Sequence, residues 1–138
     1  MNPSIIGQIT EMKCQLYLIE NGFNVLTPLG NHQKYDIVIE KNGKFTRIQI
    51  KHCTLHNDGK SICIRTKYDV RDSNKTQRKK AEKYTINDCD YFMTEYDNEF
   101  YLFPVFDTLE TKLWFTETSL KTQKRAKDYL AKNVLQEL

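Results

Sequence analysis

The sequence predicts a single α/β or α+β domain, with a first helix, several strands and a last helical segment. Apolar residues recur at three- and four-residue steps near the N-terminus, and short strand-like runs separated by turn residues follow. A chain of 138 residues, 39% hydrophobic and 28% charged, is suited to one folded core. No internal repeat or interdomain linker divides it. We therefore expect residues 1–138 to form one domain.

The first element is predicted to be a helix from Gly7 to Glu20. Its apolar residues lie at helical spacing: Ile5, Ile9, Met12, Leu16 and Ile19. Asn21 and Gly22 end the helix, because glycine accepts the left-handed conformation of a helix cap. Residues 23–26 are then expected to form a short strand.

The middle of the chain is predicted to form strands joined by tight turns. One hairpin is expected from residues 34–39 and 45–51, with Lys41-Asn42-Gly43-Lys44 as its turn. A further strand covers residues 61–66, and a second hairpin covers residues 90–96 and 99–105, across Asp97-Asn98.

Two segments lack a clear strand pattern. Residues 68–83 are polar and basic without an apolar stripe, so we expect a loop or an exposed helix there. Residues 119–138 are expected to form a final helix or a pair of helical turns.

The charge is unevenly distributed along the chain. The net charge of +3 combines −2 in residues 1–40, +9 in residues 41–85 and −4 in residues 86–138. A basic middle in a nearly balanced protein indicates a local surface for a polyanion. The alternative is a solvated lysine-rich face that has no partner.

Several classes of protein are not supported by the sequence. No apolar run reaches the roughly 18 residues of a membrane span, and no basic segment precedes an apolar one at the N-terminus. We therefore expect a cytoplasmic protein. Four scattered cysteines without a CxxC pair favour small buried side chains over a zinc site: Cys14, Cys53, Cys63 and Cys89.

The residues that indicate chemistry lie in the first predicted hairpin. Gln49 and Lys51 alternate with Ile50, so their side chains project to one face of the strand, and the hairpin brings Asp36 near them. A carboxylate, an amide oxygen and the backbone carbonyl of Ile50 can bind a hard divalent ion. An ammonium group beside them can orient water or neutralise a phosphate.

Glu11 is the fourth candidate in this arrangement. It lies on the first helix, adjacent to the apolar stripe, from where it could turn toward Asp36 and bind metal directly or through water. The alternative is a solvated helix carboxylate.

The order Glu11, Tyr35-Asp36, then Gln49-Ile50-Lys51 resembles the PD-(D/E)XK nuclease superfamily. The family pattern is a helix glutamate, a strand aspartate, and an acid-x-lysine in the next strand. Residues Tyr84 to Pro104 look like the branch of Holliday-junction-resolvase-like nucleases and group I intron homing endonucleases. Gln49 departs from the usual acid, and the intron-endonuclease branch is similar in using glutamine there.

The resemblance implies a fold, a site and a cofactor. The fold would be a restriction-endonuclease-like mixed sheet of about four or five strands flanked by helices. Glu11, Asp36, Gln49 and Lys51 would be catalytic, and Asp36, Gln49, Ile50 and Glu11 would hold Mg²⁺ or Mn²⁺.

The resemblance also gives the basic segment a substrate, double-stranded DNA. Its side chains would neutralise phosphates or contact bases: Arg71, Asn74, Lys75, Gln77, Arg78, Lys79, Lys80 and Lys83. Lys121, Lys124, Arg125 and Lys127 form a second candidate patch.

Four functions remain open at this point. The leading expectation is a site-specific homing endonuclease, followed by a junction resolvase and a restriction-type enzyme. A catalytically degraded DNA-binding module is the rival from another class. Since a duplex cut needs two strand scissions, a homodimer or homotetramer is expected.

Overall fold

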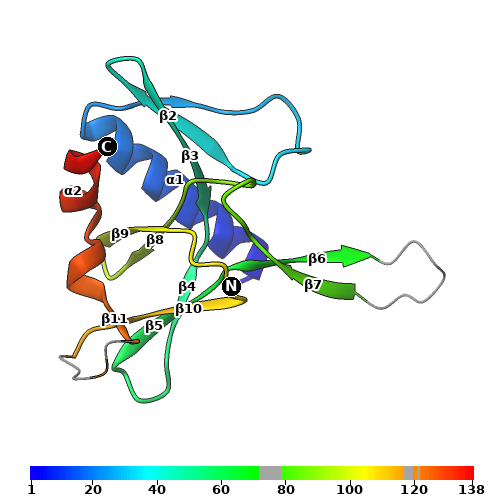
Figure 1. Ribbon diagram of the computed structural model, residues 1–138, viewed down its shortest axis with the longest axis vertical. Helices are drawn as coiled ribbons and strands as arrows, with labels where there is room; N and C mark the ends of the chain where they lie inside the picture. The colour runs from blue at the N-terminus through cyan, green and yellow to red at the C-terminus, as the bar shows by residue number, and fades with distance from the viewer. Residues whose placement is uncertain (72–78, 117–119, 121) are drawn as a thin grey trace.

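The computed structural model describes residues 1–71, 79–116, 120 and 122–138. Within these residues the centre is a five-stranded mixed sheet in the order β1-β2-β3-β8-β9 (Figure 1). Its strands are β1 (Asn24–Leu26), β2 (Ile37–Lys41), β3 (Lys44–Ile50), β8 (Tyr91–Tyr96) and β9 (Glu99–Pro104). Within this sheet, only the β3–β8 pair is parallel. The predicted α+β class and the mixed sheet are confirmed.

Helix α1 (Pro3–Glu20) starts four residues before the predicted first residue, Gly7. The Asn2 side chain accepts a hydrogen bond from the Ser4 N–H (2.8 Å), and proline occupies the first turn, where its missing N–H costs nothing. The helix ends as predicted at Glu20, with Gly22 at a φ of 88°.

The apolar stripe that indicates this helix is not the face that packs on the sheet. The buried residues of α1 are Thr10, Cys14 and Leu18. Cys14 and Leu18 pack in a core with Ile48, Met93 and other sheet residues. The helix therefore has apolar residues on two sides.

Both predicted hairpins are present. The β2–β3 turn has Asn42 and Gly43 at φ values of 55° and 80°, and the β8–β9 turn has Asp97 and Asn98 at 51° and 64°. Two consecutive positive φ values match the two-residue turn that suits the twist of antiparallel strands. The turn residues therefore fix the register of both hairpins.

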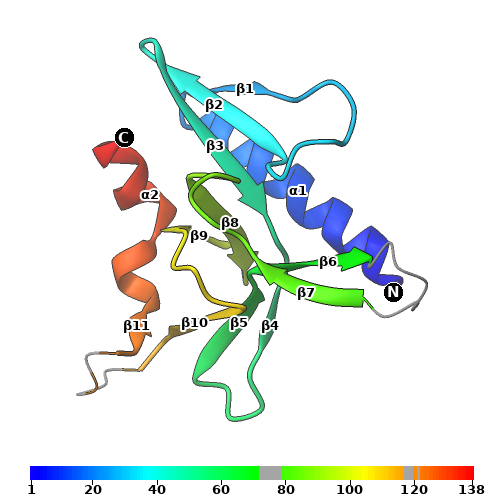
Figure 2. The same cartoon turned by 45° about the vertical axis from the view of Figure 1, so that its right-hand side comes forward.

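A second sheet of four strands lies against the other face of the central sheet (Figure 2). It has the order β11-β10-β5-β4, with β4 (Cys53–Leu55), β5 (Ser61–Arg65), β10 (Glu110–Trp114) and β11 (Lys124–Arg125). Of these strands only β5 is predicted from the sequence. Phe92 of β8 packs into a core with Ile62, Ile64 and Leu113 of this sheet, while the next residue, Met93, faces α1.

The expectation of a loop or exposed helix for residues 68–83 is wrong for the part that the structure describes. Strands β6 (Lys67–Arg71) and β7 (Lys79–Lys83) form an antiparallel pair that projects from the body (Figure 1). Pairing of β6 with β7 satisfies the backbone hydrogen bonds of both strands without an apolar stripe. The alternation of apolar and polar residues that would predict strands is therefore missing. Residues 72–78 lie outside the described residues.

The C-terminal segment forms short helical turns rather than one helix. They are η1 (Ala126–Tyr129), α2 (Ala131–Val134) and η2 (Leu135–Glu137). Leu130 separates the first two because it is extended (φ −59°, ψ 125°) and bridges Tyr101 of β9. None of the helices in the described part of the chain is long and apolar enough to cross a membrane.

Candidate active site

A cleft of about 490 Å³ lies where the end of β3 passes the N-terminal half of α1. All four predicted catalytic residues line it, together with Ile50, the predicted backbone ligand. The other lining residues are Pro3, Ser4, Gly7, Gln8 and His52. The structure thus brings Glu11, Asp36, Gln49 and Lys51 together from three separate segments.

Backbone hydrogen bonds hold Asp36 against the end of β3. The Asp36 N–H donates to the Ile48 carbonyl (3.0 Å), and Asp36 Oδ2 accepts from the Ile50 N–H (2.9 Å). The Lys51 N–H donates to the Met93 carbonyl (3.0 Å), which extends the parallel β3–β8 ladder by one residue. This extension keeps Lys51 on the same side as Gln49.

The Glu11 and Asp36 carboxyl groups are close enough to share a hydrogen bond. Burial raises the pKa of Glu11, and the Asp36 charge and a hydrogen bond to Asp36 raise it further. Burial also raises the pKa of Asp36, although the Ile50 N–H, Glu11 and the Lys51 charge oppose this rise. A cation between these two groups would therefore relieve an unfavourable pair of charges.

The Lys51 side chain is partly buried. Burial lowers its pKa, Asp36 opposes the change, and the positive charge of Arg65 adds to it. The Lys51 Nζ atom lies 5.3 Å from the centre of the Tyr84 ring. Asp36 and the aromatic ring thus help to hold an ammonium group that burial disfavours.

A second cleft of about 420 Å³ shares Lys51 and His52 with the first. It is also lined by Thr54, Cys63, Arg65, Lys67, Tyr68 and Asp69. His52 is exposed and lines both clefts, whereas strict alternation would place it on the face opposite Lys51. The alternation fails because β3 ends at Ile50.

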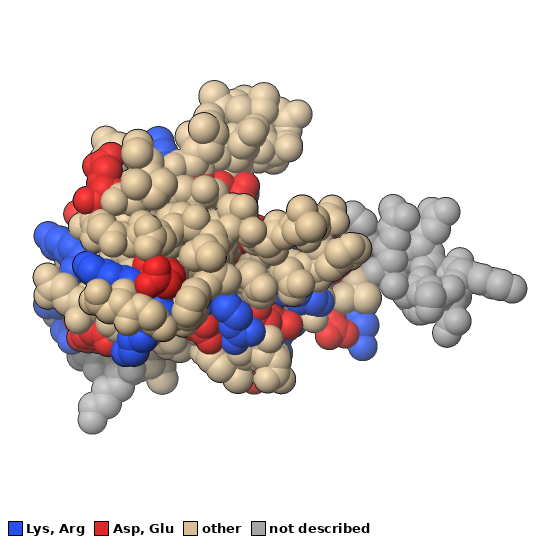
Figure 3. Space-filling model, turned by 90° about the horizontal axis from the view of Figure 1, so that it is seen from above, with Lys and Arg blue, Asp and Glu red and all other residues tan. Residues whose placement is uncertain are grey.

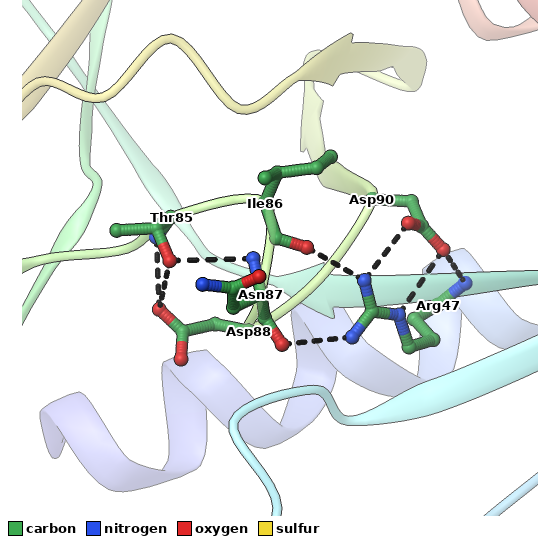
Figure 4. Close-up of polar contacts among 6 residues, drawn as sticks. All are labelled: Arg47, Thr85, Ile86, Asn87, Asp88 and Asp90. Carbon is green, nitrogen blue, oxygen red and sulfur yellow. Dashed lines mark hydrogen bonds and ion pairs between the residues drawn. The ribbon is translucent and has the colours of Figure 1, made fainter.

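The catalytic motif does not reveal Tyr84, which lies beside Lys51, or Arg47, which holds the loop that follows Tyr84. Tyr84 follows β7 and is buried against Tyr68 and Phe92. Arg47 binds both Asp90 oxygens and the carbonyls of Ile86 and Asn87, with distances of 2.7–3.3 Å (Figure 4). These contacts fix the loop between Tyr84 and β8. A long-range pair such as Arg47 and Asp90 leaves no spacing signal in the sequence.

The predicted DNA-binding residues fall into three groups. Lys80 and Lys83 are exposed on β7. Arg71 and Lys79 belong to β6 and β7, but only their backbone is described. Four others lie outside the described residues: Asn74, Lys75, Gln77 and Arg78.

The second predicted basic patch is partly engaged in contacts of its own. Arg125 pairs with Asp128 (3.4 Å), and the Lys124 Nζ atom lies 4.4 Å from the centre of the Phe106 ring. Lys121 lies outside the described residues.

Seen from above, Lys and Arg side chains lie among Asp and Glu side chains rather than forming a single-sign field (Figure 3). On this face, basic charge alone does not indicate a nucleic-acid site.

The predicted metal-binding groups of the first cleft are all oxygen donors. In the part of the chain that the structure describes, no group of three or more His, Cys, Asp or Glu side chains could hold a metal. The carboxylates of Glu11 and Asp36, with the Gln49 amide and the Ile50 carbonyl beside them, suit Mg²⁺ or Mn²⁺ better than Zn²⁺. The four cysteines are free; Cys14 and Cys89 are buried, as expected, whereas Cys53 and Cys63 are partly exposed.

Comparisons with known proteins bear on the fold and on the family of this chain. The solved structure of a bacterial homing endonuclease, I-Ssp6803I, matches with a TM-score of 0.75 and 22% identity, over 99% of this chain and 95% of that chain. A search of the curated proteins found no match. A model of the PD-(D/E)XK endonuclease family matches residues 1–132. The chain therefore belongs to the PD-(D/E)XK endonuclease family.

Proposed function

We propose that this chain is a divalent-metal-dependent endonuclease that hydrolyses double-stranded DNA at a specific site, as a homing endonuclease. The observation that carries the proposal is the convergence of Glu11, Asp36, Gln49 and Lys51 in one cleft. The restriction-endonuclease-like fold and the family membership support the reaction class. The likeness to a bacterial homing endonuclease supports the biological type.

Asp36, Glu11, the Gln49 amide oxygen and the Ile50 carbonyl would hold Mg²⁺ or Mn²⁺. When bound, such an ion lowers the pKa of water and polarises a phosphoryl oxygen. Asp36 is positioned for this role by its two backbone hydrogen bonds, so its carboxylate needs little reorganisation to act.

Lys51 has the task of neutralising charge. Its ammonium lies in the same cleft as the carboxylates, where burial strengthens its interaction with a phosphate oxygen. It also orients the attacking water while it stays protonated. Hydrolysis of a phosphodiester depends mainly on this positioning and electrostatic stabilisation.

The DNA backbone would follow the two clefts that join at Lys51 and His52. Arg65 and Lys67 line the second cleft, and Lys80 and Lys83 extend the basic surface along β7. In both ribbon views the β6–β7 hairpin leaves the body beside the N-terminal end of α1 (Figure 1, Figure 2). Residues of this end of α1 line the first cleft. Two copies, as a homodimer or homotetramer, would supply the two strand cuts.

One observation favours a second candidate function. Gln49 removes a negative charge from the position where the family usually has an acid, which weakens metal binding unless Glu11 compensates. A DNA-binding module that has lost catalysis would fit this change.

Substitution of Lys51→Ala separates these two functions. If the proposal is right, cleavage of duplex DNA in Mg²⁺ falls by at least about 100-fold, as for loss of one electrostatic group. Binding to DNA in Ca²⁺ persists, and Lys132→Ala, an exposed residue of α2, serves as the control. A wild-type protein that binds but never cuts would favour the module.

The choice of substrate is tested separately. A library of long duplexes and a set of synthetic four-way junctions are incubated with the wild-type protein in Mg²⁺. We expect cutting at one site in a small subset of duplexes. Cutting of junctions alone would reject homing in favour of a resolvase.

A further inference from the structure

The outward face of α1 carries an unpartnered apolar stripe. Its five side chains are 38–65% exposed: Ile5 (46%), Ile9 (38%), Met12 (65%), Leu16 (57%) and Ile19 (56%). In both ribbon views α1 packs against the sheet from one side only (Figure 1, Figure 2). A contiguous apolar patch of this kind on a soluble protein marks an interaction site.

The spacing of the stripe is that of a helix–helix seam. The steps between its members alternate between four and three residues, an average of 3.5 per turn over the whole length of α1. The side of α1 that packs on its own sheet is formed by other residues, Thr10, Cys14 and Leu18. The fold of the single chain therefore gives the stripe no packing role.

We propose that the α1 stripe binds the α1 stripe of a second copy of this chain, antiparallel, about a two-fold axis at Met12. The stripe is close to self-complementary about that residue, because Ile5 and Ile19 each lie seven residues from it. Ile9 and Leu16 lie three and four residues from it on opposite sides. Met12 would contact Met12 of the second copy. Ile5 would contact Ile19 of the second copy, and Ile9 would contact Leu16.

The residues beside the stripe fit a copy of the same helix. On one flank Gln8 and Gln15 also lie at nearly equal distances from Met12, so their amides come to the same level across the axis. On the other flank the Lys13 ammonium is held by Glu95 of its own chain (3.5 Å), which reduces repulsion between the two Lys13 side chains. Lys13 is the one basic residue of α1, and its pairing with Glu95 leaves the border of the stripe poorly suited to an anionic lipid surface.

The size of the stripe makes it the centre of an interface rather than the whole of it. A stable interface buries roughly 800 Å² on each partner, with an apolar core and a polar rim. The flanking Gln8 and Gln15 are available to form that rim, and the exposed Met1 side chain can extend the apolar core.

This pairing has a consequence for the catalytic clefts. Glu11 precedes Met12 by one residue, so the axis would set both Glu11 side chains at the same level along the helix pair. The cleft is lined along α1 by Pro3, Ser4, Gly7, Gln8 and Glu11, on one flank of the stripe. A two-fold axis perpendicular to the plane of the two helices would place both clefts on the same side of the dimer.

Sedimentation equilibrium over a range of concentrations tests the surface. The wild-type protein is expected to exceed the mass of one chain, and Met12→Glu is expected to fall to half of that mass or less. Leu29→Glu is the matched control, because Leu29 is 101% exposed outside α1 and its variant should keep the wild-type mass. Leu16→Lys provides a second interface variant, and the thermal melting of each variant reports whether it is folded.

A wild-type monomer at every concentration, or a folded Met12→Glu protein with the wild-type mass, would overturn the proposal. The orientation is tested with single cysteine variants under mild oxidation. Ile5→Cys should cross-link to Ile19→Cys in a mixture, beyond the background of the native cysteines, whereas Ile5→Cys linked to itself would reject the antiparallel register. Because the readout is mass, failure here leaves the proposed nuclease activity untouched.

Discussion

Glu11 and Asp36, the two proposed metal-binding carboxylates, also destabilise the fold when both are ionised. Burial raises the pKa of both groups, so the folded protein binds protons more tightly than the unfolded chain does. Between the ordinary carboxyl pKa and the raised one, the free energy of unfolding therefore falls as pH rises. Below the ordinary carboxyl pKa the folded and unfolded states are both protonated, so there the two groups do not change the free energy of unfolding with pH.

Replacement of Glu11→Gln should remove part of this pH dependence. In EDTA, the melting temperature of the variant should exceed that of the wild type by a few degrees near neutral pH, and the difference should vanish near about pH 4. Thermal melts across this range, without DNA, measure the effect. A constant difference at all pH values would show that the cause is not ionisation.

Gln49 gives a second prediction at this scale. Gln49→Glu adds a negative charge to the oxygen donor set, so the affinity for Mn²⁺ or Mg²⁺ should rise by about tenfold. Gln49→Leu removes the oxygen and should lower that affinity. Calorimetric titration of the DNA-free protein measures both, and equal affinities in all three proteins would remove Gln49 from the metal site.

The predictability of the site depends on which contacts are local. Asp36, Gln49 and Lys51 could be assembled from the sequence because one hairpin and strand alternation fix their relation. The position of Arg65 could not be predicted in this way. Arg65 lines the second cleft from β5 of the second sheet, and no short segment of the sequence indicates how the strands of that sheet pair.

At the scale of elements, the Arg47 contacts tie β3 to the loop before β8. Arg47→Ala breaks them and leaves Asp90 without its cation, so the free energy of unfolding should fall by about 1–3 kcal/mol. Cleavage should fall as well, because the loop follows Tyr84, which lies beside Lys51. Chemical denaturation measures the first effect, with Lys132→Ala as the control, and an unchanged midpoint would contradict this account.

The β6–β7 hairpin yields a prediction about DNA. Lys80→Ala and Lys83→Ala should each weaken binding to all sequences and reduce the slope of log K against log salt by about 1. Fluorescence anisotropy in Ca²⁺ at several salt concentrations measures the slope. Lys132→Ala should leave it unchanged, and slopes equal to wild type for both β7 variants would remove this strand from the interface.

Elements with local signals were predictable, and elements defined by pairing were not. Asn42-Gly43 and Asp97-Asn98 fix their hairpins through positive φ values that few residues tolerate. Strands β6 and β7 pair with each other, and the two residues of β11 pair with β10. No window of the sequence contains both partners of such a pair at a recognisable spacing.

At the scale of the whole molecule, one chain offers one candidate catalytic cleft among its described residues, while a duplex has two strands. If two copies act together, a plasmid with one target should pass to the linear form with little nicked intermediate. Met12→Glu should instead accumulate nicked plasmid, because monomers cut one strand at a time. Gel electrophoresis over the time course distinguishes the two patterns, and wild-type nicking alone would argue against paired sites.

The central claim is that Asp36 and its neighbours form a site that hydrolyses DNA. The most direct test measures cleavage of the duplex library in Mg²⁺ by wild type and by Asp36→Asn, which keeps an oxygen for the Ile50 N–H. We predict cleavage by the wild type, none by Asp36→Asn, and equal DNA binding by the two in Ca²⁺. Cleavage by Asp36→Asn at the wild-type rate would contradict the claim.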